Sequence, residues 1–469
     1  MMRYRPLAIP LLLALLASAC SSAADQAAED TVDPPSTTTT SEPPAPEFAG
    51  TSIIVGVPPD TPGMQDIIAL TPEFFTGPTG IEVDIVVLPE QELRERAAGN
   101  GTARMRFSVF AFDNFFVPLV GPWDWFADLA PFAEADPNYD IDDLIPSVRS
   151  SVSVDGQLFG APFYADSSIV MFNQDVIDAA GITVPEQPTW EQIADIAAQV
   201  DSDDVAGICL QGVPGWDDLG ASLTTVVNTF GGTWWERNQD GTPGVAQINQ
   251  PNSSFREATE FYIDLTQNFG IDDPANAGFD ECLEEFQNGN VALWYDSTRA
   301  APILEADDSP IAGNVGYTLA PTNLTGVSGW LRAQSFVISN FVDTREPSWE
   351  FISWATSAEF ARIKAENLPG DLADVEQNTR LSTHANPEFA EANQPYGDIV
   401  LEAITTSPID NPGTTPRPGL AGGVQFVGIP EFQDIANRCT QHLSDAIAGK
   451  ISVGHALNTC QTIATEVSQ

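Results

Sequence analysis

A short segment at residues 161–170, "APFYADSSIV", brings a phenol, a carboxylate and two hydroxyls together between apolar side chains. Its polar members are Tyr164, Asp166, Ser167 and Ser168. Groups of these types form hydrogen bonds worth about 0.5–1.5 kcal/mol net each, and more when one partner is charged. Several such groups must therefore converge before they can hold a ligand that water solvates well.

Motifs for catalysis and metal binding are missing from the sequence. It contains no HExxH, GxSxG, Walker-A or glycine-rich dinucleotide motif. Its histidines, His384, His442 and His455, are scattered without metal-ligand spacing. We expect no metal and no cofactor. A glycosidase pair of carboxylates would leave no mark in the sequence, because that pairing is spatial.

Strand and helix patterns alternate from residue 51 onward. Short β-rich runs at 52–57, 81–88 and 106–112 are separated by helical patterns at 63–75 and 90–98. This order predicts right-handed crossovers and a parallel sheet. Ligands of such open sheets bind beyond the carboxyl ends of the strands.

Two of these predicted strand ends carry polar side chains. Asp60 follows the first strand, and Asp113, Asn114 and Phe115 follow the third. Either carboxylate could equally be an ordinary turn residue.

A second α/β region begins near residue 165. Thr189 and Gln192 predict a capping box for a helix that ends near Val200, and 207–212 is a strand candidate. Because "FYADSS" lies between the two α/β regions, we expect the chain to cross there from one lobe to the other.

Length and charge limit the class of protein. The chain has 469 residues, too many for one ordinary core, so we expect at least two lobes. It carries 66 acidic and 18 basic residues, a net charge of −48. Nucleic acids and anionic lipid surfaces are therefore poor partners.

The N-terminus predicts export. Arg3 and Arg5 precede a short apolar run that ends in "ASAC", which resembles a bacterial lipobox with Cys20 as the lipidated residue. Ordinary signal cleavage is the alternative. We expect a signal peptide at 1–19 and, because 20–50 is rich in Ser, Thr, Pro and acids, a disordered tether there.

The other four cysteines allow three pairings in an oxidising compartment. Cys439 and Cys460 lie nearly equally far from the tip of a predicted helical hairpin, which favours Cys439–Cys460 and leaves Cys209 with Cys282. Buried free thiols are the alternative.

Four segments resemble the extracellular solute-binding proteins, family 1, of bacterial ABC importers, related to maltose-binding protein. The most similar branch binds sugar alcohols such as mannitol and sorbitol. The segments are "SVSVDGQLFGAPFYADSSIVMFNQDVIDAAGITVPEQPTWEQI", "FDECLEEFQNGNVALWYDSTRAA", "GNVGYTLAPTN" with "GWLRAQSFVISN", and "EPSWEFISWATSAEF".

The resemblance implies a two-lobed α/β fold of the periplasmic-binding-protein type II, each lobe a mainly parallel sheet flanked by helices, with a hinge of crossing strands. Lobe one would hold 51–164 and 296–340, and lobe two 165–295 and 341–469. The implied protein is a monomeric, lipid-anchored, non-enzymatic receptor on the outer face of the cytoplasmic membrane. It would capture a small carbohydrate or polyol and deliver it to ABC permease subunits.

The resemblance also implies a cleft in which aromatic rings cover C–H faces and polar groups bind hydroxyls. Carried over position by position, the ligand-binding candidates are Asp60, Met64, Asn114, Phe115, Tyr164, Asp166, Ser167, Ser168, Trp216, Asp217, Trp294, Asp296, Trp330, Arg332 and Gln334. For each tryptophan, packing in the core is the alternative.

The chain departs from the polyol branch at several of these positions. Relatives commonly have tryptophans near Arg332 and Gln334, a tyrosine near Phe115 and a glutamate at Asp166. A guanidinium and an amide in place of rings favour a more polar ligand, such as a sugar acid.

Two other functions would fit a secreted carbohydrate-binding chain. One is a hydrolase, which would release products from oligosaccharides. The other is a sensor subunit that passes the ligand-bound state to a membrane histidine kinase.

Overall fold

The structure is a computed structural model that describes residues 46–466, except 60, 62, 105, 239–241, 327, 369–378, 408 and 410–424. Cys20, the predicted signal peptide and Asp60 lie outside the described residues. The end of the predicted tether is folded, contrary to expectation. The Gly50 N–H donates to the Gly80 carbonyl at 2.8 Å, and Phe48 packs against the core.

The first lobe contains a five-stranded sheet in the order β2-β1-β3-β13-β6. β1 pairs with β2 and β3 in parallel, as predicted, whereas β13 runs against the other four strands and makes two antiparallel pairings. The predicted strand at 52–57 matches β1 at both ends. The strands are β1 (Ser52–Val57), β2 (Glu82–Val87), β3 (Val109–Asp113), β6 (Ala161–Asp166) and β13 (Arg332–Ile338).

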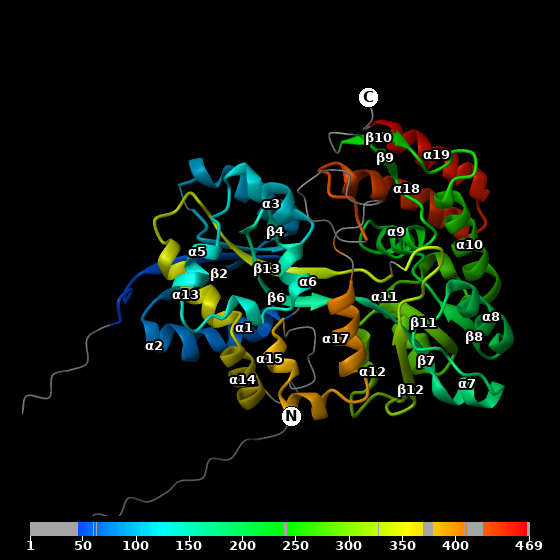
Figure 1. Ribbon diagram of the computed structural model, residues 1–469, viewed down its shortest axis with the longest axis horizontal. Helices are drawn as coiled ribbons and strands as arrows, with labels where there is room; N and C mark the ends of the chain where they lie inside the picture. The colour runs from blue at the N-terminus through cyan, green and yellow to red at the C-terminus, as the bar shows by residue number, and fades with distance from the viewer. Residues whose placement is uncertain are drawn as a thin grey trace, which may run out of the picture. The chain divides into compact units, whose positions relative to one another are not determined.

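The second lobe contains a four-stranded sheet in the order β12-β7-β11-β8 (Figure 1). Here β7 runs against the other three strands, so two of the three pairings are antiparallel. The strands are β7 (Ser168–Asn173), β8 (Ala206–Cys209), β11 (Val291–Ser297) and β12 (Val315–Leu319).

Amphipathic helices cover both sheets. The predicted capping box is present at the start of α8, whose Trp190, Ile193 and Val200 are buried. The helices before the first crossing are α1 (Met64–Leu70), the π-helical turn η1 (Thr71–Thr76), α2 (Gly77–Thr79), α3 (Glu90–Gly99), α4 (Phe116–Val120), α5 (Ala130–Ala135) and α6 (Pro146–Ser151). Those of the second region are α7 (Gln174–Ala180), α8 (Trp190–Val200), α9 (Leu219–Thr229), α10 (Ser254–Phe269), α11 (Phe279–Gln287) and α12 (Ala300–Leu304).

The C-terminal part contributes helices to both lobes. α13 packs against β13 and α5, α17 contacts strands of both sheets, and α18 packs against α9. These helices are α13 (Arg345–Ala355), α14 (Ala358–Asn367), α15 (Leu381–His384), α16 (Pro387–Ala392), α17 (Gly397–Thr406), α18 (Phe432–Ile447) and α19 (Val453–Thr465). Short strand pairs are formed by β4 (Ser153–Val154) with β5 (Gln157–Leu158), and by β9 (Trp235–Arg237) with β10 (Pro243–Ala246).

The sheets divide the chain differently from the predicted lobe boundaries. β12 pairs with β7 and so belongs to the second lobe, although 296–340 was assigned to the first. Phe351 of α13 packs against Phe75 and Phe336 of the first lobe, although 341–469 was assigned to the second. Both later crossings lie further along the chain than predicted: the chain returns to the first lobe between β12 and β13 and leaves it only after α13 and α14.

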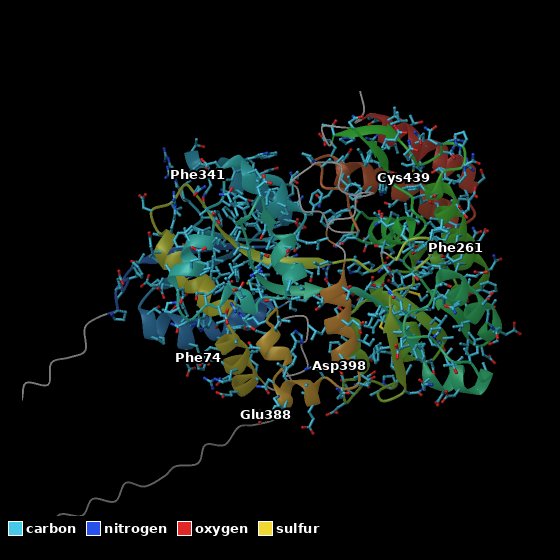
Figure 2. All side chains as sticks on the ribbon, viewed as in Figure 1. Phe74, Phe261, Phe341, Glu388, Asp398 and Cys439 are labelled. Carbon is cyan, nitrogen blue, oxygen red and sulfur yellow. A yellow bond between two sulfur atoms is a disulfide. The ribbon has the colours of Figure 1, made fainter. Side chains whose placement is uncertain are left out.

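Both predicted disulfides are present. Cys439 of α18, labelled in Figure 2, pairs with Cys460 of α19. Cys209 at the end of β8 pairs with Cys282 of α11. α18 and α19 form the expected antiparallel hairpin, which explains why cysteines equidistant from its tip meet.

Candidate functional site

A cavity of about 200 Å³ lies where the chain crosses between the lobes. Four aspartates, two arginines, two glutamines and several smaller or aromatic side chains line it. The lining residues are Asp166, Gln211, Asp217, Asp218, Ala221, Ser222, Phe279, Asp296, Ser297, Arg299, Trp330, Arg332 and Gln425.

The crossing predicted at "FYADSS" is confirmed. β6 of the first sheet ends at Asp166, β7 of the second begins at Ser168, and Ser167 alone joins them. The Ser167 hydroxyl donates to the Trp330 carbonyl at 2.7 Å, and the Ser407 hydroxyl donates to the same carbonyl at 2.7 Å. Three crossing segments are therefore tied together beside the cavity.

One wall of the cavity carries a bidentate ion pair. Arg332 donates from Nε and Nη2 to the two carboxylate oxygens of Asp166 at 3.0 and 3.1 Å. Asp166 is 1% exposed and also accepts a hydrogen bond from the Ser297 hydroxyl at 2.5 Å. Burial opposes the charge of Arg332, but the neighbouring carboxylates raise its pKa above the usual range. The charges of Asp166 and Arg332 therefore neutralise each other without a ligand.

The wall contributed by the second lobe carries a carboxylate with neutral partners. Asp296, at the end of β11, is 2% exposed and accepts from Gln211 Nε2 at 2.8 Å and from the Ser297 N–H at 2.7 Å. Among the described residues no Lys or Arg nitrogen lies within 4.0 Å of it. Burial raises the pKa of Asp296, and the hydrogen bonds and the more distant Arg299 only partly oppose this.

Two further aspartates stand beside this wall, after β8. Enclosure by the cavity raises the pKa of Asp217 to about 6, with Arg332 opposing and Asp113 and Asp166 adding to the shift. Its side chain keeps 42% exposure and lies 3.7 Å from Arg332 Nη1. Burial also raises the pKa of Asp218. The second arginine of the cavity lining is Arg299, whose guanidinium carbon Cζ lies 3.6 Å from the ring centre of Phe279.

The structure brings five of the predicted site residues to the cavity: Asp166, Asp217, Asp296, Trp330 and Arg332. Others serve the crossing instead. Asn114 donates to the Leu331 carbonyl at 2.9 Å and accepts from the Ala333 N–H at 3.1 Å, so its carboxamide fastens β3 to β13. The Ser168 hydroxyl accepts from the Trp330 N–H at 3.3 Å.

The remaining predicted residues lie in packed or flanking positions. Trp294 is buried against Phe279 and Phe286, which is the core-packing alternative. Met64 is buried in the main core. Tyr164 and Gln334 are ladder partners of β6 and β13, with the Arg332 guanidinium 5.7 Å from the Tyr164 ring.

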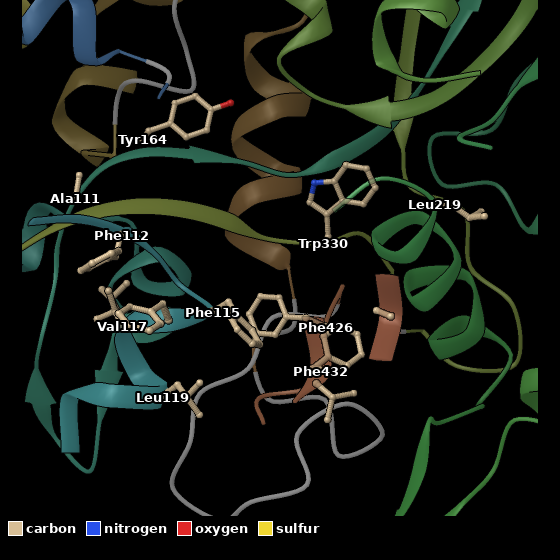
Figure 3. Packing of buried hydrophobic residues seen from close by; sticks show 14 of the residues in the cluster. Ala111, Phe112, Phe115, Val117, Leu119, Tyr164, Leu219, Trp330, Phe426 and Phe432 are labelled. Carbon is tan, nitrogen blue, oxygen red and sulfur yellow. The ribbon is translucent and has the colours of Figure 1, made fainter. Parts of the chain in front are cut away.

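Aromatic rings close one side of the crossing. Phe115 of the first lobe lies 5.6 Å from the ring of Trp216 in the second and 5.1 Å from that of Phe426 (Figure 3). Phe115 is buried and is not among the residues that line the cavity, so its ring supports the site from behind.

Sequence reasoning missed several lining residues: Gln211, Asp218, Ala221, Ser222, Phe279, Ser297, Arg299 and Gln425. The strand-end rule would have found some of them, since Gln211 follows β8, and Ser297 and Arg299 end and follow β11. Gln425 carries no local signal. It reaches the site because its side chain bonds both backbone groups of Leu331.

A larger cavity of about 970 Å³ lies on the first lobe, between α5, α13 and the segment around Phe48. It contains none of the crossing residues, so the smaller cavity is the candidate site. Within the described ranges, no cluster of His, Cys, Asp and Glu could hold a metal ion. No helix in the same ranges is long and apolar enough to span a bilayer.

The fold and the inter-lobe cavity define a two-lobed binding protein. Residues 59–362 match the family of bacterial extracellular solute-binding proteins, and the chain belongs to that family. It is 32% identical over 381 residues to the mannitol-binding protein of Pseudomonas aeruginosa, covering 80% of this chain and 84% of that protein.

Solved structures agree with the fold. A solute-binding protein of an ABC transporter from Agrobacterium vitis, with bound D-mannitol, has a TM-score of 0.76 and 33% identity, covering 89% of this chain and 98% of that one. One from Agrobacterium radiobacter in complex with ribitol has a TM-score of 0.71 at 19% identity, covering 89% and 99%. The latter likeness concerns the fold alone.

Proposed function

We propose that this protein captures a small carbohydrate or sugar alcohol between its lobes and presents it to the permease of an ABC importer. The observation that carries the proposal is the cavity at the crossing, which gathers carboxylate, guanidinium, amide and indole groups from both lobes. Its relatives at 32% and 33% identity are named for, or contain, mannitol.

The groups match the chemistry of a polyhydroxylated ligand. Hydroxyls both donate and accept, so they can serve the aspartates and the arginines of the cavity together. Trp330, two residues before the start of β13, supplies an apolar surface for the C–H face of the ligand. Several hydrogen bonds at about 1 kcal/mol each are needed to offset the hydration of such a ligand.

Closure of the lobes would couple binding to transport. A ligand held by both walls binds the closed state better than the open one and shifts the population accordingly. The hinge would consist of Ser167, the segment before Leu331 and Ser407, which are hydrogen-bonded together.

Isothermal titration tests the proposal. We expect saturable binding of at least one of D-mannitol, D-glucitol, ribitol or maltose, and unaltered recovery of the ligand afterwards. Absence of binding by every polyol and sugar, with the protein folded by circular dichroism, would contradict the proposal. Release of products from oligosaccharides would favour a hydrolase instead.

We also propose that the lipid on Cys20 and the tether that follows hold the receptor at the outer face of the membrane, near its permease. Cys20→Ser should release the protein from the membrane fraction while leaving ligand affinity unchanged. Equal membrane retention of this variant would argue against the anchor.

A further inference from the structure

The second-lobe wall of the cavity offers one acceptor, Gln211 Oε1, that nothing in the described chain satisfies, beside a buried carboxylate, Asp296. Gln211 is 5% exposed, and its Oε1 is buried without a hydrogen-bond partner. The Nε2 of the same side chain donates to Asp296 Oδ2 at 2.8 Å, so the two acceptors are neighbours. A ligand that enters here must bring donors, because a further acceptor would face a carboxylate and an amide oxygen.

The charges of the cavity also favour a ligand that carries hydrogen-bond donors. Among the described residues that line the cavity are four aspartates and two arginines, an excess of two acidic side chains. Arg332 is already engaged by Asp166 through two hydrogen bonds. A cationic group would reduce the excess, whereas an anionic group would increase it. Charge–charge energies in partly enclosed sites reach several kcal/mol before desolvation is subtracted.

We propose that the cavity selects a sugar or polyol carrying a protonated amine, which binds between Asp296 and Gln211 Oε1, over the neutral polyol and over the corresponding sugar acid. This inference rests on the proposed function and names the ligand class of the same site. An ammonium group donates three hydrogen bonds and accepts none, which fits two adjacent acceptors. This inference replaces the sugar acid expected from Arg332 and Gln334, because Asp166 accepts from Nε and Nη2 of that guanidinium and Asp217 lies 3.7 Å from its Nη1.

Matched ligands test the inference directly. Each series contains the alditol, its 1-amino-1-deoxy derivative and the aldonate of one configuration, and the D-manno, D-gluco and ribo series are titrated calorimetrically at pH 7.5. In whichever series binds, we expect the amine to bind about tenfold more tightly than the alditol, which corresponds to about 1.4 kcal/mol. The aldonate should bind at least about tenfold more weakly than the alditol.

The outcomes separate the two proposals. Equal or weaker binding of the amine beside a binding alditol overturns the inference and leaves the proposed function intact. Failure of all three series while maltose binds overturns the inference alone, and failure of maltose as well overturns the proposed function with it.

Two variants locate the selectivity. Asp296→Asn keeps the shape of the side chain and should reduce the amine-to-alditol preference to about one. Asp217→Asn, at the more exposed aspartate, should lower the preference by no more than about threefold. An unchanged preference in folded Asp296→Asn would overturn the assignment, and the wild-type series decides the matter if that variant does not fold.

Discussion

The two walls of the cavity use the same residue type to opposite effect. On the first-lobe wall, Asp166 meets a guanidinium in bidentate geometry, with both partners fixed in adjacent strands. On the second-lobe wall, Asp296 accepts from the Gln211 amide and from a backbone N–H, and burial raises its pKa. Breaking a buried ion pair is costly because it leaves one charge uncompensated, whereas an incompletely neutralised buried carboxylate in a cavity is a candidate for ligand binding.

Removing Asp166 should have the largest effect. Asp166→Ala leaves Arg332 largely buried without its bidentate partner, and we expect the free energy of unfolding to fall by about 3 kcal/mol. Urea-induced unfolding measures it. Asp142→Ala is the matched control, since it removes an ion pair with Arg149 at 2.7 Å whose carboxylate is 86% exposed. The control should lose less than about 0.5 kcal/mol. Equal losses of unfolding free energy in the two variants would show that the buried pair of Asp166 matters no more to stability than an exposed one.

Changing Asp296 should act with the opposite sign on stability. Asp296→Asn removes a buried charge without a close cation, so we expect the ligand-free protein at pH 8 to become more stable by about 1 kcal/mol. Affinity for the alditol should fall at the same time. Thermal unfolding and titration of the same sample measure both. A marked loss of stability would contradict this prediction, because it would show that Asp296, like Asp166, stabilises the folded protein.

The smallest expected effect concerns pH. Glu90 on α3, beside Arg94 and near the cavity, has its pKa raised from 4.5 to about 7, chiefly by burial and by Asp113, with Arg94 opposing. Between these two values the folded state holds a proton that the unfolded state lacks, so stability should rise as pH falls from 8 to 5. Since 42% of the Glu90 side chain is exposed, we expect a modest slope.

Glu90→Gln is the control for this slope. Its melting temperature should rise less than that of the wild type over the same pH interval, because the titrating group is gone. Identical profiles would show that Glu90 does not titrate in this interval.

Much of the fold could be predicted from local patterns. The run at 52–57, the capping box of Thr189 and the crossing at Ser167 are all encoded within a few residues. The Cys439–Cys460 pairing followed from the symmetry of a short hairpin. The lobe boundaries were wrong after residue 295 because no local pattern tells which of two sheets a strand such as β12 joins.

The candidate site was only partly predictable for a related reason. Asn114, Ser167 and Asp296 are all polar residues near strand ends, and the sequence does not distinguish them. The Asn114 side chain donates to the backbone carbonyl of Leu331, and the Ser167 hydroxyl donates to that of Trp330. Both partners lie more than a hundred residues away in the sequence. Asp296 faces the cavity.

By itself, the sequence determined that this is an acidic, two-lobed α/β chain of the solute-binding type with hydrogen-bonding groups at its crossing, and it predicts export. Short-range periodicity, capping and family motifs suffice for that. Only the tertiary structure decided which of those groups remain unsatisfied, because a buried polar atom is satisfied or left for a ligand according to partners that folding brings from distant segments.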